Sequence, residues 1–261
     1  MSLSDSLTTL REVAKIVKRP VQLGLRQRKA AGEVYSYELK GTDIEVFLRD
    51  DVGEDVATLV QTFNQDHYVV PPQASAAMAA AGDQPYAMDL GANIGMFGAW
   101  FLREHPNGRV TAYEADPDNA RVHQLTVDAN AGRRKWELEA AAAGVKDGEV
   151  AFVTGWHTNS RLAEPGEDAT VVPEHDVLAR AKDVDLLKVD IEGAEWAILA
   201  DKRLKKLPVK VIALEYHPER CPSDDPRALV HERLQAAGYE TADADFDATD
   251  EHGMVWGWRP A

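Results

Sequence analysis

Three observations predict a doubly wound α/β fold for this chain. Strand and helix patterns alternate from Tyr86 onward, a glycine-rich turn follows the first such strand, and an acid ends the next strand. This alternation is typical of a mostly parallel sheet with helices on both faces. The 261 residues suffice for one such domain, which we expect at residues 71–261 behind a helical and β-hairpin extension at residues 1–70.

The extension divides into helices and one hairpin. Residues up to about Arg28 favour one or two helices, interrupted near Pro20. Period-two alternation around a Lys-Gly-Thr-Asp turn predicts a β-hairpin over Gly32–Asp50. Apolar residues at helical spacing predict a helix within Asp55–His67, and an Ala-rich helix is expected within residues 71–85.

The core continues with short apolar runs separated by amphipathic segments. Predicted strands are Tyr86–Leu90, Gly108–Ala115, Lys135–Ala142, Glu149–Gly155, Asp185–Asp190 and Val209–His217. Predicted helices are Gly95–His105, Asp116–Ala131 and Pro226–Ala237. The tail from Thr241 to Arg259 predicts a terminal pair of strands, in which Trp256 and Trp258 serve packing.

Composition narrows the classes of partner. A net charge of −15 disfavours nucleic acid, whose binding depends on Lys and Arg replacing counterions. The basic stretch Lys15–Lys29 is expected to be solvated. No apolar run long enough for a bilayer and no secretory signal is expected, and the single Cys221 forms neither a disulfide nor a zinc cluster. We therefore expect a cytoplasmic protein without a membrane partner.

The segment Met88–Trp100 predicts a cofactor site. A glycine-rich turn between a strand and a helix brings the backbone and free N–H groups close to a ligand. Gly91, Gly95 and Gly98 depart from the G-x-G-x-x-G dinucleotide fingerprint. They match instead the D-x-G-x-N-x-G pattern that methyltransferases show.

Glu114 ends the next strand, 23 positions after Gly91. An acid at this place in nucleotide-binding α/β folds accepts hydrogen bonds from ribose hydroxyls, which indicates an adenosine ligand. Ala141 and Ala142, near the end of the third strand, leave room for adenine, although a plain buried strand end explains them equally well. Tyr68 is the one candidate for cofactor contact before the core.

Several motifs agree in order and spacing with one family. The matching pieces are Phe47–Tyr68, Met88–Val122, Asp185–Leu199 (DLLKVDIEGAEWAIL) and Val211–Pro218. On these the chain resembles the FkbM-type methyltransferases from about Phe47 to Pro218. The resemblance implies a Rossmann-like class I methyltransferase fold of seven strands, the last antiparallel. It also implies S-adenosylmethionine as cofactor, with S-adenosylhomocysteine as product, and O-methylation of a small molecule such as a sugar or polyketide.

The resemblance also assigns residues. It implies that Glu114 holds the ribose and that Asp190 lies near the sulfonium and the acceptor. The residues expected around the methionine part and the rest of the cofactor are Asp89, Gly91, Ala92, Asn93, Gly95 and Ala115. No metal is expected, because no D-D or N-D pair flanks these carboxylates.

Asp190 and His217 stand at the carboxyl ends of two predicted strands. They are the catalytic candidates, since ligands of open α/β sheets bind beyond these ends. Asp190 and Glu192 have an alternative role as helix caps, and Glu195 is interpreted as an ordinary first-turn acid. His217 is a candidate general base because imidazole titrates near neutrality, or else a solvated loop residue. Glu192, Glu215 and His217 are candidates for binding the acceptor.

The polar segment Gly155–Leu162 adds His157, Asn159 and Ser160 as substrate-binding candidates, with a solvated loop as the alternative. The sequence thus predicts a small-molecule O-methyltransferase. Alternatives are transfer to nitrogen or a peptide, a nicotinamide-dependent oxidoreductase, and a non-catalytic cofactor-binding protein.

Overall fold

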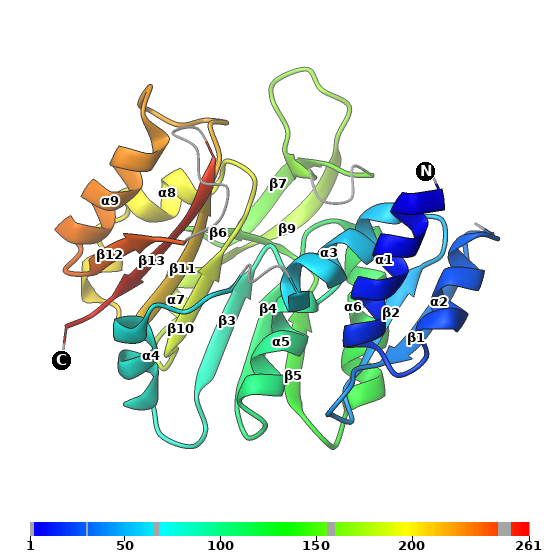
Figure 1. The fold of residues 1–261 in the computed structure, drawn as a ribbon. Coiled ribbons are helices and arrows are strands. Elements are labelled where there is room, and N and C mark those ends of the chain that lie inside the picture. The colour runs from blue at the N-terminus through cyan, green and yellow to red at the C-terminus, as the bar shows by residue number, and fades with distance from the viewer. Residues whose placement is uncertain (1–2, 30, 65–67, 156–159, 245–251, 261) are drawn as a thin grey trace.

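The computed structural model describes the chain apart from residues 1–2, 30, 65–67, 156–159, 245–251 and 261 (Figure 1). The main sheet consists of β3 (Tyr86–Leu90), β4 (Arg109–Tyr113), β5 (Lys135–Glu139), β10 (Leu186–Val189), β11 (Val211–Tyr216), β12 (Glu240–Asp243) and β13 (Gly253–Trp258). The spatial order of these seven strands is β12-β13-β11-β10-β3-β4-β5. Only β13 is antiparallel to its neighbours, so the predicted mostly parallel sheet with a reversed last strand is confirmed.

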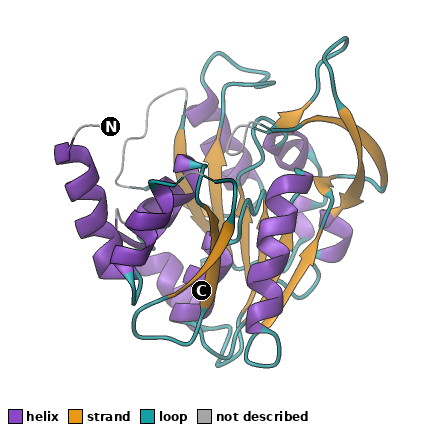
Figure 2. Ribbon diagram, turned by 90° about the vertical axis from the view of Figure 1, so that its right-hand side faces the viewer, coloured by secondary structure: helices purple, strands orange, loops and turns teal. Residues whose placement is uncertain are grey.

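Helices cover both faces of this sheet, as the turned view shows (Figure 2). One face carries α4 (Pro72–Ala79), α5 (Met96–Glu104) and α6 (Pro117–Asn130). The other carries α7 (Val177–Arg180), α8 (Glu195–Ala200) and α9 (Pro226–Ala236). Successive strand residues point to opposite faces: Leu186 joins the first hydrophobic cluster and Leu187 the second. Burial on both faces explains why these strands are continuous apolar runs in the sequence.

The N-terminal extension packs against α5 and α6, helices that cover the first face of the sheet. It comprises α1 (Leu3–Ile16), α2 (Pro20–Gln27), the hairpin β1 (Val34–Glu38) and β2 (Glu45–Arg49), and α3 (Gly53–Asn64). Side chains of α6 satisfy the open edge of β2: Asn130 Oδ1 accepts from Glu45 N at 3.1 Å, and Thr126 Oγ1 accepts from Phe47 N at 3.1 Å. These bonds and a shared hydrophobic cluster attach the extension to the sheet.

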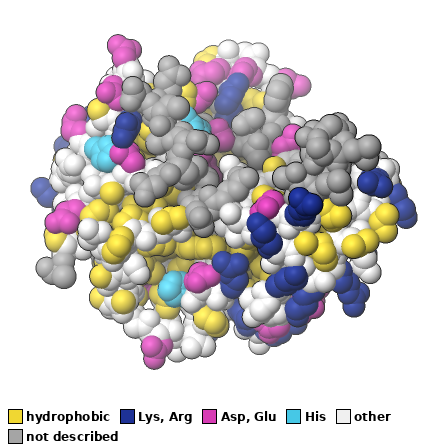
Figure 3. Space-filling view, viewed as in Figure 1, with side chains coloured by type: hydrophobic (Ala, Val, Ile, Leu, Met, Phe, Trp, Pro, Cys, Tyr) yellow, Lys and Arg dark blue, Asp and Glu magenta, His cyan; other side chains and the backbone are white. Residues whose placement is uncertain are grey.

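The basic stretch lies in α1 and α2, where Figure 3 shows Lys and Arg side chains gathered over the N-terminal elements. Lys15 pairs with Glu12 at 2.8 Å on the surface. Arg26 lies over the ring of Tyr35, with its guanidinium carbon 4.0 Å from the ring centroid. Among the described helices, none has both the length and the apolar character that crossing a bilayer requires.

A second sheet of order β6-β9-β7-β8 lies beside the first. Its strands are β6 (Ala142–Gly144), β7 (Gly148–Val153), β8 (Arg161–Leu162) and β9 (Thr170–Asp176). The predicted third strand of the core therefore ends at Glu139, and residues 142–144 belong to this second sheet. The sequence analysis missed β8 and β9, because β8 is two residues long and β9 contains Pro173 and an irregular burial pattern.

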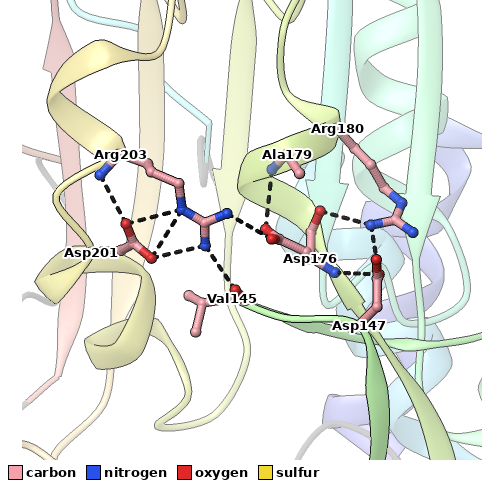
Figure 4. A network of polar contacts seen from close by, with 7 residues as sticks. All are labelled: Val145, Asp147, Asp176, Ala179, Arg180, Asp201 and Arg203. Atoms are coloured by element: carbon pink, nitrogen blue, oxygen red, sulfur yellow. Dashed lines mark hydrogen bonds and ion pairs between the residues drawn. The ribbon is translucent and has the colours of Figure 1, made fainter.

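A network of ion pairs ties the second sheet to the core (Figure 4). Arg203 donates to Asp176 Oδ2 at 2.6 Å and to Val145 O at 2.7 Å, and its guanidinium also bonds Asp201. Asp176 caps α7 by accepting from Ala179 N at 3.1 Å. Arg203, which follows α8, thus bonds the chain at the ends of β6 and β9.

Candidate active site

A cavity of about 570 Å³ opens beyond the carboxyl ends of β3, β4, β10 and β11. Its far wall is α3, which contributes Ala57, Thr58 and Gln61. The predicted site residues that line it are Tyr68, Gly91, Ala92, Asn93, Glu114, Ala115, Ala141, Ala142, Ser160, Asp190, Glu192, Glu215 and His217. Asp89 and Gly95 lie behind the lining, and His157 and Asn159 lie outside the described residues. The parallel strands therefore gather residues from four separate segments of the sequence.

The glycine-rich turn has the tight geometry that the sequence predicts. Gly91 has φ +75°, and a Cβ there would lie 1.7 Å from the carbonyl oxygen of Asp190, so the turn passes directly over the end of β10. Asn93 adopts a left-handed φ of +48°, and its side-chain oxygen accepts from Ile94 N at 2.7 Å. Gly95, with φ +92°, precedes α5, and a Cβ there would lie 2.6 Å from the buried ring of His123. Gly95 therefore serves packing between helices, whereas Gly91 brings backbone to the cavity.

Glu114 connects this turn to the end of β4. One carboxylate oxygen accepts from Asn93 N and the other from Asp116 N, each at 2.7 Å. The side chain is 6% exposed, and burial raises its pKa to about 7, although the two backbone hydrogen bonds oppose the shift. A carboxylate has about four acceptor positions, so two remain, which is the number that a ribose diol needs.

A buried lysine lies beneath the turn. Lys188 Nζ is 3.3 Å from Asp89 Oδ1 and 3.1 Å from Asp190 Oδ2, and it donates to Gly91 O at 2.7 Å. Burial lowers the pKa of Lys188, but the carboxylates of Asp190 and Asp89 outweigh burial and hold it well above its usual value. The sequence analysis missed Lys188, although a lysine inside the apolar strand Leu186–Val189 is a signal that the strand carries a buried charge.

Asp89 is completely buried, which explains why it does not line the cavity. Burial raises the pKa of its carboxyl group, and the neighbouring Lys188 only partly offsets the shift. Its expected role at the methionine part of the cofactor is therefore indirect in this structure: Asp89 positions Lys188, which contacts the glycine turn.

The ends of β10 and β11 form an acid–histidine cluster, by which we mean Asp190, Glu192, Glu195 and His217. Glu195 is completely buried and accepts from Gly193 N and His217 N, each at 2.9 Å. It also lies 3.3 Å from His217 Nδ1. The interpretation of Glu195 as an ordinary first-turn acid is therefore wrong: its position in α8 is as expected, but its carboxylate points inward and orients the imidazole.

The remaining nitrogen of His217 faces two cavity acids. Its Nε2 lies 3.7 Å from Glu192 Oε2 and 3.9 Å from Asp190 Oδ1. Burial lowers the pKa of His217, but Glu195 and the other two carboxylates outweigh this and raise it to about 10. Burial also raises the pKa of Glu192 to about 7. The solvated-loop alternative for His217 is therefore wrong, since the residue is 5% exposed.

Comparison with known proteins identifies the family. The family model of the methyltransferase FkbM domain matches residues 89–241, more than half of the chain. The chain belongs to this family. The match starts at the aspartate before the glycine turn and includes the whole acid–histidine cluster.

Two further kinds of relative were found. The AMB antimetabolite synthetase AmbE of Pseudomonas aeruginosa is 25% identical over 250 residues, and the chain spans only 11% of its length while 74% of the chain is covered. The solved N-terminal domain of EvdMO1 with S-adenosylhomocysteine bound is 15% identical, with a TM-score of 0.46 and coverage of 94% of this chain and 99% of that one. The precorrin-6y C5,15-methyltransferase of Geobacter metallireducens is also 15% identical, with a TM-score of 0.43 and coverage of 76% and 96%.

The rim of the cavity in this FkbM-family chain contains residues that the sequence analysis only partly identified. Ser160 donates to Asp116 Oδ2 at 2.6 Å, so its hydroxyl helps to hold the loop at the start of α6. His252, which the analysis missed, lies with Nε2 2.9 Å from Glu215 Oε1. Its ring centroid is 5.2 Å from that of His217. Only the antiparallel placement of β13 beside β11 brings His252 here, so no local pattern could have indicated it.

Tyr68 lines the cavity beside α5, the helix that follows the glycine turn. Its ring packs against Phe97 and Trp100 of α5, each with centroids 5.1 Å apart. Burial raises the pKa of its hydroxyl, so the group stays protonated at neutral pH. Trp256 is fully buried in β13, in agreement with the predicted packing role.

Proposed function

We propose that this FkbM-family methyltransferase transfers a methyl group from S-adenosylmethionine to a hydroxyl of a small molecule. The observation that carries the proposal is the charge of the cavity. Lys188 is the one Lys or Arg among the described lining residues, and two aspartates already surround its ammonium. The other charged lining residues are Glu54, Glu114, Asp190, Glu192, Glu215, Glu219, His217 and His252.

This charge distribution separates the candidate cofactors. A dinucleotide needs basic groups or several free helix N–H groups for its pyrophosphate, and an acidic lining repels it. A sulfonium cofactor carries a positive charge and is attracted by the same lining. The nicotinamide-dependent alternative is therefore disfavoured by both the glycine spacing and the cavity charge.

The residues present fit S-adenosylmethionine along the cavity. Glu114 presents two free acceptor positions for the ribose, and the small Ala141 and Ala142 border a space for adenine. Gly91 lines the cavity in a turn that only glycine permits, because a side chain there would collide with the end of β10, and we assign the methionine part to this turn. S-adenosylmethionine supplies an electrophilic methyl group when it is bound. We assign the Asp190 carboxylate to the place where the cofactor meets the acceptor.

The acceptor occupies the end of the cavity near the acid–histidine cluster and Glu215. Transfer to an oxygen requires alignment of that oxygen, exclusion of water and removal of the hydroxyl proton. His217 and Glu215 orient the acceptor by hydrogen bonds, and the carboxylates of Asp190 and Glu192 lie nearest for the proton. The raised pKa of His217 means that a proton already occupies the imidazole at neutral pH, so it donates rather than accepts in this state.

The extension, residues 1–70, shapes the acceptor pocket through α3. Segments added to a common core often carry specificity. We place the protein in the cytoplasm, with its single cysteine, Cys221, free. A role in natural-product biosynthesis is supported by the relative named as an antimetabolite synthetase. Transfer to nitrogen or to a peptide is separated from O-methylation only by a screen of acceptors.

Calorimetry with S-adenosylhomocysteine, and with NAD as paired control, tests the cofactor. We expect saturable binding of the first with one site per chain and no binding of the second. Binding of NAD alone, or of neither compound, would overturn the proposal. An acceptor screen with radiolabelled methyl donor then separates hydroxyl from amine acceptors.

A further inference from the structure

The acid–histidine cluster has the geometry of a metal site. Asp190, Glu192 and His217 each offer one ligand atom, and these atoms lie within 4.8 Å of one another. The distances from His217 Nε2 to the two carboxylate oxygens, 3.7 Å and 3.9 Å, are too long for hydrogen bonds. They leave room for an ion between the three atoms, because ligands that each lie roughly 2.0–2.2 Å from one metal are at most about 4.4 Å apart.

The imidazole of His217 has a carboxylate partner at one nitrogen, as metal-ligating histidines commonly have. Buried Glu195 faces Nδ1 at 3.3 Å, and the side chain of His217 is 7% exposed. When the imidazole is neutral, a carboxylate facing Nδ1 keeps the proton on that nitrogen and leaves the lone pair on Nε2, and such partners are typical of histidine ligands. Nε2 faces the cavity, where Glu192 Oε2 and Asp190 Oδ1 lie at ion-pair distance from it.

The backbone that presents Glu192 is strained. Glu192 has φ +49°, and Gly193 follows with φ +90°, where a Cβ would lie 2.7 Å from Glu219 O. Non-glycine residues in this region are strained and concentrate at functional sites. The strain turns the Glu192 carboxylate toward His217 instead of leaving it as a helix cap.

From these observations we propose that Asp190, Glu192 and His217 bind one divalent transition-metal ion, with Glu195 as the group that orients His217. Mixed imidazole and carboxylate ligands suit Mn²⁺, Co²⁺, Fe²⁺ or Zn²⁺, whereas Mg²⁺ and Ca²⁺ prefer oxygen alone. The ion takes the place of the proton on His217, because an imidazole must be neutral to bind a metal.

The role of the ion rests on the proposed function. With the ion bound, Asp190 and Glu192 serve as its ligands and no longer as proton acceptors. The ion binds the acceptor's hydroxyl oxygen and lowers the pKa of that hydroxyl, so the proton is lost to water before the methyl transfer. The oxygen then forms its bond to the methyl carbon, and the electron pair of the broken carbon–sulfur bond stays on sulfur. Proton, methyl group and electrons are thereby accounted for without a further reactant.

Mn²⁺ binding to the full chain tests the site without any acceptor. The free-ion electron paramagnetic resonance signal is titrated with protein, and Co²⁺ visible absorption reports nitrogen and oxygen ligation. We expect one ion per chain, and at least tenfold weaker binding in Glu192→Gln and His217→Gln. Glu195→Gln, which changes only the orienting group, is expected to weaken binding about 10–100-fold. The matched control Glu54→Gln removes the same charge from the opposite wall and is expected to bind Mn²⁺ as the wild type does.

The outcomes separate this inference from the proposed function. No binding at millimolar Mn²⁺, unchanged affinity in the ligand variants, equal loss in Glu54→Gln, or equal competition by Mg²⁺ would each overturn the metal site. Circular dichroism melting shows whether each variant is folded, and the milder Glu195→Gln keeps the test valid if His217→Gln unfolds. Wild-type protein that binds Mn²⁺ but not S-adenosylhomocysteine refutes the proposed function alone. The reverse result refutes the metal site alone.

Discussion

Glu114 gives the sharpest test of the cofactor site, because its carboxylate is buried and only some of its hydrogen-bond acceptor positions are occupied. Its two oxygens accept Asn93 N and Asp116 N in the free protein, which leaves two acceptor positions for a ribose diol. Glu114→Gln preserves the volume of the side chain but removes its charge and one of its acceptor oxygens. A hydrogen bond to a charged group contributes about 1.5–3 kcal/mol, so affinity for S-adenosylhomocysteine should fall roughly 10–150-fold.

The pKa of Glu114 adds a dependence on pH to this prediction. Burial raises that pKa to about 7, and ribose hydroxyls bind the ionised carboxylate. Ligand binding therefore competes with protonation: affinity should rise with pH up to about 7, by up to tenfold per unit, and be constant above it. Glu192 also has a pKa raised to about 7, so the variant Glu192→Gln is the matched control.

Isothermal titration calorimetry of S-adenosylhomocysteine between pH 5.5 and 8.5, values chosen to span the pKa of about 7, measures both effects. We expect the slope below neutrality to disappear in Glu114→Gln and to persist in Glu192→Gln. Equal affinities of wild type and Glu114→Gln, or a wild-type affinity independent of pH, would refute the ribose role of Glu114.

Three further variants test the interior of the site. Lys188→Met leaves two carboxylates unpaired and should lower the free energy of unfolding by about 3–5 kcal/mol in urea denaturation, whereas a loss below about 1 kcal/mol would contradict a buried ion pair. Gly91→Ala places a Cβ 1.7 Å from backbone and should prevent folding or ligand binding, while Gly132→Ala, with φ +78° and open space, should cost only about 1 kcal/mol. His217 should remain protonated at pH 8 in a nuclear magnetic resonance titration, since carboxylates raise its pKa to about 10. In Glu195→Gln that pKa should fall by at least one unit, and an unchanged titration would exclude the orienting role.

Much of the fold was predictable because its signals are local. Short apolar runs place β3, β4, β10 and β11 correctly, and the hairpin at residues 34–49 follows from period-two alternation around a turn. In the second sheet, the strand predicted over Glu149–Gly155 corresponds to β7, whereas β8 and β9 escaped prediction because no apolar period marks them. The strand predicted over Lys135–Ala142 joined residues that belong to two sheets, since the sequence does not show where a chain leaves a sheet edge.

The candidate site was predictable where backbone geometry decides it. Gly91 and Asn93 have left-handed φ angles, and the sequence pattern reflects that requirement directly. Residues whose importance depends on burial were misjudged or missed: Glu195 resembles any first-turn acid in the sequence, and no local pattern shows which partners Lys188 meets. Burial changes their chemistry, because a charge removed from water persists only beside a partner.

The sequence by itself determined the α/β class of the fold, the glycine turn and the acid at the end of the second strand, since each is a pattern of short range along the chain. The tertiary structure alone decided which charges meet. It placed Lys188 between two aspartates, Glu195 behind His217, and His252 beside Glu215. The physical reason is that electrostatic partners are selected by distance and desolvation in three dimensions, and residues far apart in the chain carry no mark of either.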